Sequence, residues 1–244
     1  MASRSEKARE RAERAAAALA EQKAKERRRR MLSVVGVVVA MAVIIGGALA
    51  YSLTRDSGTD APSSSSYSLG IGKKSAPHTV VVYEDFLCPY CQAFEAASRA
   101  QLTKLAQQGK VYVEYRPFHF LDPDYSLEAL NAFAVVKGAY PSTSPTGVAK
   151  KFHDLLYENQ PSEQGPFPST SDLVDLAVKA GAAKSKVEDG IKDTSSEKDW
   201  TDGATKEALA TGLQGTPTVL LDGTQFQQGS SVEDIASNLI KQLS

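Results

Sequence analysis

The stretch Val82-Tyr83-Glu84-Asp85-Phe86-Leu87-Cys88-Pro89-Tyr90-Cys91 lies where a run of β-branched residues gives way to a helical pattern. The Thr-Val-Val-Val-Tyr run over 79–83 predicts a buried strand. Pro89 suits the first position of a helix, and apolar residues recur at helical intervals up to a Gln-Gln-Gly stop at 107–109. Alternating residues over 111–116 then predict a second strand. The stretch therefore predicts a β-α-β unit with two cysteines at the turn into the helix.

The two cysteines are the only ones in the 244 residues, so they act as one pair. Cys88 is expected at the open N-terminus of the helix, where unpaired N–H groups and the helix dipole favour a thiolate. Cys91, one turn later, is expected to face inward and to attack a mixed disulfide on Cys88, which releases the partner. This spacing predicts a redox-active pair.

Two structural interpretations of the pair compete with the redox one. A structural disulfide over so small a loop would add little stability, because the entropic gain grows with loop length. A zinc site needs two further ligands, and the three histidines of the chain lack ligand spacing. The histidines are His78, His119 and His153. We therefore expect no metal ion and no bound cofactor.

The remaining pattern downstream is mostly helical and then returns to a sheet. Helices are expected around 127–136, 148–156, 173–180 and 204–209, separated by Pro- or Gly-containing breaks. A strand over 218–221, an Asp222-Gly223 hairpin turn, a return strand at 225–226 and a closing helix over 232–243 follow.

These motifs resemble the DsbA-like disulfide oxidoreductases of the thioredoxin-fold family. The Cys-Pro-Tyr-Cys motif precedes Gly212-Leu213-Gln214-Gly215-Thr216-Pro217-Thr218 in the order and at the distance of that family, and residues 152–160 look like its helical insertion. The resemblance implies an α/β thioredoxin fold with an inserted helical subdomain at about 122–212. It covers the chain from Leu69 onward.

The resemblance also implies roles for named residues. It gives catalysis to Cys88 and Cys91, tuning of the pair to Pro89 and Tyr90, and substrate contact to Thr216 and Pro217, with Pro217 as the family's cis-proline. Relatives often carry a buried carboxylate six residues before the first cysteine as a proton relay, and this chain has Val82 there. Glu84 and Asp85 are the candidate substitutes, although strand alternation places them on opposite faces.

The expected activity is the introduction of disulfides into exported proteins, with reduced exported polypeptides as substrates. The family usually needs a quinone-linked membrane partner to reoxidise the pair, and a monomer is expected. Cys-Pro-Tyr-Cys is also the glutaredoxin motif, but the long segment between 118 and 215 exceeds the short connection of glutaredoxins. A reductase or isomerase using the same pair, and a non-enzymatic membrane-anchored metal or peptide binder, remain alternatives.

The first third of the chain has a different composition. Residues 1–30 hold 11 Lys and Arg against 5 Asp and Glu, leaving 17 against 24 for the rest. Residues 31–53 carry no charge and would span about 34 Å as a helix, enough to cross a bilayer. Within 20 residues of this span, eight basic residues precede it and two follow. The positive-inside rule therefore predicts a cytoplasmic N-terminus and a single transmembrane helix.

The interleaved Glu residues of 1–30 argue against a nucleic-acid-binding arm. A cleaved signal is the alternative to an anchor, because Ala48-Leu49-Ala50 has the form of a cleavage site. The apolar stretch is long for a signal core, so an uncleaved anchor is favoured. The Ser-rich stretch 54–76 is then expected to be a flexible linker, and 77–244 an extracytoplasmic domain.

Overall fold

The computed structural model describes residues 64–121 and 123–244. The expected basic segment, the expected membrane span and the first part of the expected linker lie outside these residues. Among the described residues, no helix has the length and hydropathy needed to cross a membrane.

The described elements alternate between strand and helix at both ends and are helical in the middle. They are β1 (Leu69–Ile71), β2 (His78–Glu84), α2 (Pro89–Gln107), β3 (Val111–Pro117), α3 (Pro123–Ala139), α4 (Val148–Glu158), α5 (Thr170–Lys179), α6 (Lys184–Lys192), α7 (Lys198–Ala210), β4 (Thr218–Leu221), β5 (Thr224–Gln225) and α8 (Val232–Leu243). The expected strand, helix and strand around the cysteine pair are confirmed.

The strands form one mixed sheet in the order β1-β3-β2-β4-β5. β2 and β3 are parallel and are joined by α2, whereas β1, β4 and β5 each pair antiparallel with their neighbours. Asp222 and Gly223 both have positive φ, as the tight turn between β4 and β5 requires. β2 is thus the central strand, and its carboxyl end leads directly to the cysteine pair.

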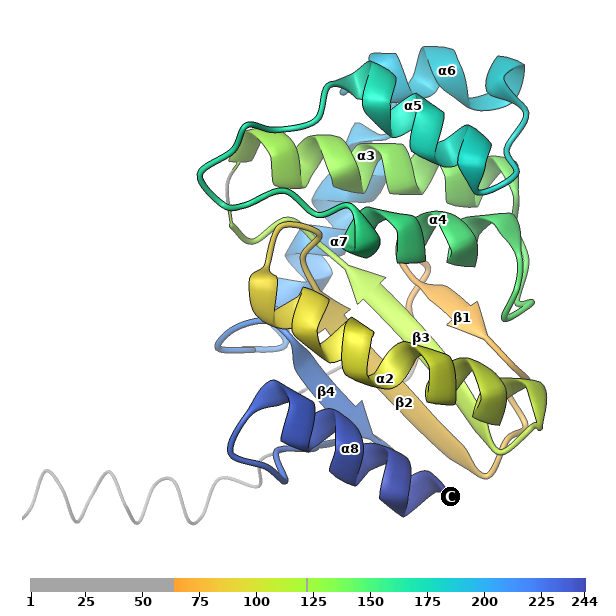
Figure 1. Cartoon of the computed structure of the whole chain (residues 1–244), viewed down its shortest axis with the longest axis vertical. Helices are drawn as coiled ribbons and strands as arrows, with labels where there is room; N and C mark the ends of the chain where they lie inside the picture. Colours follow the sequence, from red (N-terminus) through yellow and green to blue (C-terminus); the bar gives the residue numbers. More distant parts are fainter. Residues whose placement is uncertain (1–63, 122) are drawn as a thin grey trace, which may run out of the picture. The chain divides into compact units, whose positions relative to one another are not determined.

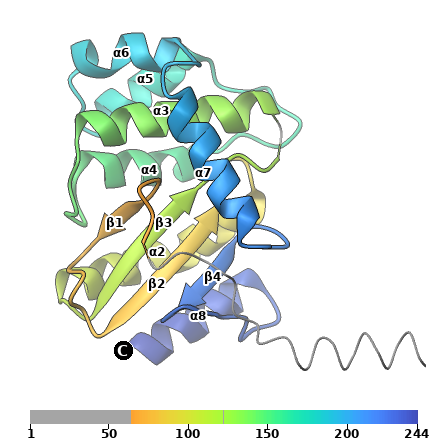
Figure 2. The ribbon, with the colours of Figure 1, turned by 180° about the vertical axis from the view of Figure 1, so that it is seen from behind.

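Successive residues of β2 pack into two different layers, because side chains alternate across a strand. Val80 and Val82 belong to the main core, which includes Phe94 of α2 and Leu239 of α8. Figure 1 shows α2 and α8 side by side over that face. Val81 packs on the opposite face, which α7 crosses in Figure 2. Burial on both faces explains why the strand is apolar without alternation.

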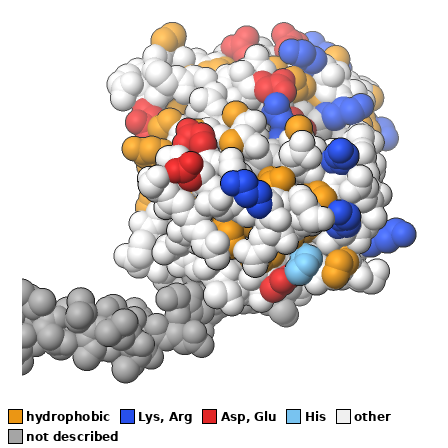
Figure 3. All heavy atoms as spheres, turned by 60° about the horizontal axis from the view of Figure 1, so that its bottom comes forward, with side chains coloured by type: hydrophobic (Ala, Val, Ile, Leu, Met, Phe, Trp, Pro, Cys, Tyr) orange, Lys and Arg blue, Asp and Glu red, His pale blue; other side chains and the backbone are white. Residues whose placement is uncertain are grey.

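The inserted helices α3 to α6 lie together beyond one end of the sheet, and α7 returns from them toward β4 (Figure 1). Their apolar faces join the main core, with α3 and α4 contributing Phe133 and Phe152. The face drawn in Figure 3 carries isolated hydrophobic side chains among polar and charged ones. Most of the large apolar side chains of the described residues are buried in the core.

Two elements differ from the sequence-based expectation. Leu69 and Ile71 are buried in β1, which pairs with β3, so the expected linker 54–76 was wrong at its C-terminal end. The folded unit therefore begins before the expected boundary at Pro77. Helix α6 was not predicted from the sequence. Only Val187 and Ile191 of its nine residues are buried, so its apolar residues are too few to form a recognisable helical pattern.

Candidate active site

Cys88 occupies the N-cap of α2, directly after the loop that leaves β2. Its backbone is extended, and its carbonyl accepts the amide protons of Cys91 and Gln92, both at 3.1 Å. Pro89 stands at the start of the helix, where no N–H partner is needed. Cys88 and Cys91 are free thiols in this structure. The first sulfur thus lies at the helix N-terminus, as the sequence predicts.

The surroundings of the two sulfurs shift their pKa values in opposite directions. A hydrogen bond from the Cys91 thiol, with help from the backbone amides of Cys91 and Tyr90, lowers the pKa of Cys88 to about 6 despite burial. Burial raises the pKa of Cys91 well above its ordinary value, and the bond to Cys88 acts in the same direction. Cys88 is therefore a thiolate at neutral pH, and Cys91 is a thiol.

The second motif of the sequence comes to the same place. The Thr216–Pro217 peptide bond is cis, as the resemblance implies. The Sγ atom of Cys88 lies 3.4 Å from the carbonyl oxygen of Thr216, across 128 positions of sequence. Cys88 is 3% exposed, whereas the neighbouring Tyr90 is 65% exposed. Cys88 therefore lies against the Thr216–Pro217 loop, and the exposed Tyr90 follows it two residues later in the sequence.

Asp85 is fully buried and serves the backbone around the site. Its carboxylate accepts the amide protons of Leu87, Phe120 and Leu121 and the hydroxyl proton of Ser126, at 2.6 to 3.0 Å. These four donors tie the loop after β2 to the loop after β3 and to α3. These contacts explain the burial of Asp85 by a structural role, which is to hold the two loops together.

Glu84 is the last residue of β2 and is also buried, on the face of the strand opposite to Asp85. Its Oε1 atom accepts a hydrogen bond of 2.6 Å from Nε2 of His153. Its Oε2 atom has no hydrogen-bond partner within the described part of the chain. The charge of Glu84 contributes to the raised pKa of Cys91. Glu84 therefore combines a fixed orientation with an uncommitted oxygen near the buried thiol.

His153 comes from α4 of the helical insertion and is fully buried. Its ring packs against the rings of Phe86, Tyr115 and Tyr157, with centroids 4.5 to 5.8 Å away. Burial alone would lower the pKa of His153, but the carboxylate of Glu84 and further hydrogen bonds raise it to about 9. His153 is thus a buried imidazolium. The sequence does not point to this role, because its partner Glu84 is 69 positions away.

A second buried carboxylate, Glu95 of α2, lies in the same cluster. Burial raises its pKa to about 7, and neither of its oxygens has a partner among the described residues. Ligand atoms of Glu95, His153 and Asp154 lie within 4.8 Å of one another. However, both ring nitrogens of His153 bond to carboxylates, and Lys150 bonds to Asp154. The cluster fits an ion-pair network better than a metal site.

The acidity of Cys88 gives a testable pH dependence. Because the folded pKa of about 6 is below the ordinary 9.0, the thiolate stabilises the reduced protein. This stabilisation is complete at pH values above the ordinary cysteine pKa of 9.0, and it is lost as the pH falls through the folded pKa of about 6. At neutral pH the lowered pKa of Cys88 therefore shifts the thiol–disulfide equilibrium of the pair toward the dithiol.

We expect iodoacetamide to alkylate Cys88 of the reduced protein with a midpoint near pH 6, while the buried Cys91 stays unmodified. Tyr90→His should move that midpoint lower, because a nearby cation favours the thiolate. Mass spectrometry after timed alkylation measures both. A wild-type midpoint near that of an ordinary thiol would contradict the assignment.

Comparisons with known proteins agree with this geometry. A family model described as Thioredoxin matches residues 64–241. A probable disulfide bond formation protein D of Bacillus cereus is 31% identical over 199 residues, covering 79% of this chain and 88% of that protein. The reduced structure of DsbA from Mycobacterium tuberculosis has a TM-score of 0.59 at 26% identity, covering 72% of this chain and 90% of that one. BdbD from Bacillus subtilis shares the fold, with a TM-score of 0.64 at 21% identity, and covers 78% and 98% of the two chains.

Proposed function

The chain belongs to the thioredoxin family as a DsbA-like thiol-disulfide oxidoreductase, and on this premise we propose that it introduces disulfide bonds into exported polypeptides. The proposal is supported by the opposite pKa shifts of the two cysteines: the pKa of Cys88 is lowered and that of Cys91 is raised. A thiolate on Cys88 stabilises the dithiol form but does nothing for the disulfide. The oxidised pair therefore tends to pass its disulfide to other proteins.

The proposed reaction has two exchange steps. A substrate thiolate attacks Sγ of Cys88 in the Cys88–Cys91 disulfide, and Cys91 leaves and takes up a proton. The second substrate thiolate then attacks the substrate sulfur of the mixed disulfide, and Cys88 leaves as a thiolate. Two electrons pass from the substrate to the enzyme, and a quinone-linked membrane partner is proposed to remove them. Pro89 and Tyr90 are proposed to tune Cys88 from the start of α2.

Thr216 and Pro217 are proposed to hold the substrate backbone. Thr216 is partly exposed beside Cys88, in the segment just before β4. An extended peptide pairing there would place its cysteine over the reactive sulfur. This mode recognises main chain rather than side chains, which suits an enzyme with many substrates.

Glu84 is proposed as the proton relay for Cys91. The leaving sulfur is buried and has a raised pKa, so its departure is favoured by a nearby proton donor. Glu84 is buried, bound to a protonated His153, and has an oxygen with no other partner among the described residues. Asp85 is proposed to be structural, because four donors already surround its carboxylate.

The proposal is tested by oxidative refolding of a reduced disulfide protein with the full-length chain. The oxidised enzyme should form substrate disulfides in a 1:1 stoichiometry with its own pair, and a quinone-linked reoxidase should make the reaction catalytic. Free-thiol counting follows both partners. Faster reduction of insulin disulfides than oxidation of dithiols would overturn the proposed direction.

We also propose that the chain is anchored by residues 31–53, with 1–30 in the cytoplasm and the catalytic domain outside the membrane. The charge asymmetry around the uncharged stretch supports this topology. Mass spectrometry of the membrane fraction should find an uncleaved chain that retains residues 1–30. A chain beginning at Tyr51 would instead establish a cleaved signal.

A further inference from the structure

The buried carboxylate of Glu84 is connected to the surface by a short series of hydrogen bonds. Nε2 of His153 bonds to Glu84 at 2.6 Å, and Nδ1 of the same ring bonds to Oδ1 of Asp154 at 3.2 Å. Glu84 and His153 are at most 1% exposed, whereas the side chain of Asp154 is 23% exposed. Three side chains thus link the surroundings of Cys91 to solvent.

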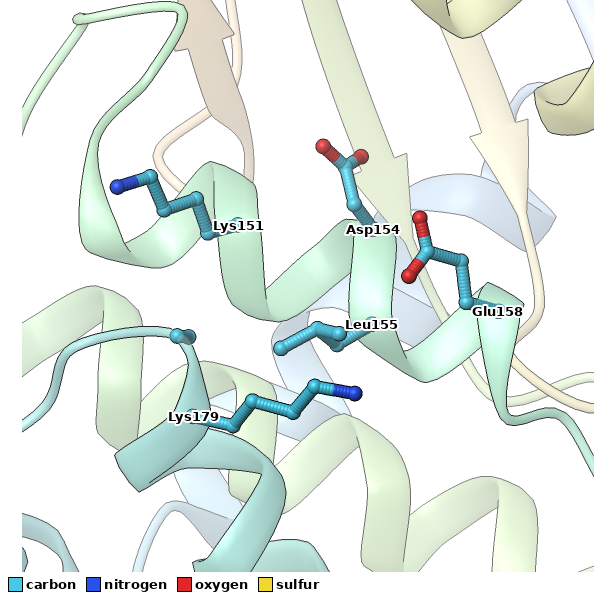
Figure 4. Close-up of a pocket in the computed structure, with 6 residues that line it drawn as sticks. Lys151, Asp154, Leu155, Glu158 and Lys179 are labelled. Atoms are coloured by element: carbon cyan, nitrogen blue, oxygen red, sulfur yellow. The ribbon is translucent and has the colours of Figure 1, made fainter.

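Asp154 reaches solvent at an open pocket of about 250 Å³ between α4 and α5. Figure 4 shows Asp154 and Glu158 projecting from the same side of α4, with Lys179 of α5 beyond Leu155. This pocket is separate from the Thr216–Pro217 loop that borders Cys88. Water can therefore reach Asp154 while a substrate covers the cysteine pair.

The proton needs such a separate path. Cys88 is 3% exposed and Cys91 is 1% exposed even without a substrate. A peptide bound over Cys88 closes that side further. The imidazole of His153 can take a proton at Nδ1 and give one at Nε2, so it passes a proton without moving. Its ring is held between aromatic neighbours, which keeps both nitrogens aligned.

We propose that His153 and Asp154 form the proton path between Glu84 and solvent, opening on the α4 side of the molecule. The inference rests on the proposed relay role of Glu84. In the oxidised protein, His153 takes up a proton at Nδ1 from water through Asp154, so that both ring nitrogens are protonated. When Cys91 leaves as a thiolate, Glu84 passes it the proton of His153 Nε2, and His153 is left neutral with its remaining proton on Nδ1. When the pair is reoxidised, the proton of Cys91 leaves by the same groups in reverse. No electron travels along the path.

The charges around His153 are consistent with this role. The titratable and charged groups that face it are Glu84 from β2, Tyr115 from β3, Glu95 and Arg99 from α2, and Lys150, Asp154 and Tyr157 from its own helix. Burial raises the pKa of Asp154, but the hydrogen bond from His153 and the charge of Lys150 outweigh burial and lower it. Asp154 is therefore an ionised acceptor at the surface end.

Lys150 stabilises the outer end without taking part in the path. Its ammonium group is buried, bonds to Asp154 and lies 4.8 Å from the ring centre of Tyr115. Glu95 shares the cluster, but its oxygens lack hydrogen bonds among the described residues, so it is not on the path. The continuous series runs through Glu84, His153 and Asp154.

The test compares Glu84→Gln, His153→Gln and Asp154→Asn in the full-length oxidised chain. Dithiothreitol reduces the pair, and stopped-flow absorbance follows the appearance of the Cys88 thiolate. Rates are corrected for the thiolate fraction of dithiothreitol. Each variant is expected to slow this step roughly tenfold or more, because positioned acid–base groups contribute about 10²–10⁴-fold. Glu158→Gln, one turn along α4 and bonded to Arg99, is the matched control and should react at the wild-type rate.

The pH profile separates a proton path from a structural role. The corrected wild-type rate should fall as the pH rises through about 9, where His153 loses its proton, and this dependence should vanish in His153→Gln. The midpoint of Cys88 alkylation should stay unchanged in Asp154→Asn. A Lys150→Met, Asp154→Asn double variant removes the unpaired lysine and should be as slow as Asp154→Asn.

Wild-type rates in His153→Gln and Asp154→Asn, together with a slow Glu84→Gln, would overturn the path and leave the relay role of Glu84 intact. Wild-type rates in all three variants would remove the relay role as well. A slow Glu158→Gln would show that loss of charge on α4 is enough to slow the reaction, which would also overturn the path.

Discussion

Replacing Cys88 with serine is expected to reduce oxidative refolding by the full-length chain to the uncatalysed rate. A hydroxyl at the N-cap of α2 cannot form or donate a disulfide. The remaining Cys91 is buried with a raised pKa, so its thiol is a poor nucleophile that substrates do not reach. The assay starts from a reduced, denatured substrate protein whose native state contains disulfide bonds. The rate at which this substrate regains its own activity measures the effect.

Ser142→Ala, an exposed change in the loop between α3 and α4, serves as the control and should retain full activity. Equal thermal midpoints of the two reduced variants would show that Cys88→Ser is folded. Refolding at the wild-type rate by folded Cys88→Ser would remove Cys88 from the reaction.

Replacing Cys91 with alanine is expected to trap substrates on Cys88. The Cys88 sulfur remains nucleophilic at the helix N-terminus, but no second thiol lies one turn away to resolve the mixed disulfide. Cells expressing this variant should accumulate adducts of higher mass that disappear on treatment with a reductant. Non-reducing electrophoresis with mass spectrometry of the trapped partners gives the measurement and the substrates.

The Cys88→Ser, Cys91→Ala double variant is the control for adducts and should form none. If Cys91→Ala forms no adducts, or if the single Cys88→Ser variant forms them instead, the assigned order of attack is wrong.

Much of the fold follows from local patterns. The β-branched run of β2, the Pro89 start of α2 and the Asp222-Gly223 turn all specify structure within a few residues. β1 does not, because three residues in a stretch rich in Ser and Gly carry no periodicity and are ordered by pairing with β3. α6 is short, and its Gly190 fits because it packs closely on Val135 of α3.

The candidate site likewise has features that the sequence predicts and features that only the structure shows. The cysteine spacing and the Thr-Pro motif predict the pair and its neighbour at Thr216, which lie 3.4 Å apart. The distinction between Glu84 and Asp85 needs the structure, since only the contacts show Asp85 bound by backbone amides and Glu84 by His153. Nothing in one sequence pairs a strand carboxylate with a histidine 69 positions later.

The equilibrium reduction potential of the Cys88–Cys91 pair tests the central claim most directly. The pair is equilibrated with glutathione buffers at pH 7, and the fraction of dithiol is counted by alkylation. Because the Cys88 thiolate stabilises the reduced form, we predict a potential above that of thioredoxin, roughly −270 mV. A potential at or below that value would contradict the oxidase assignment and favour a reductase using the same residues.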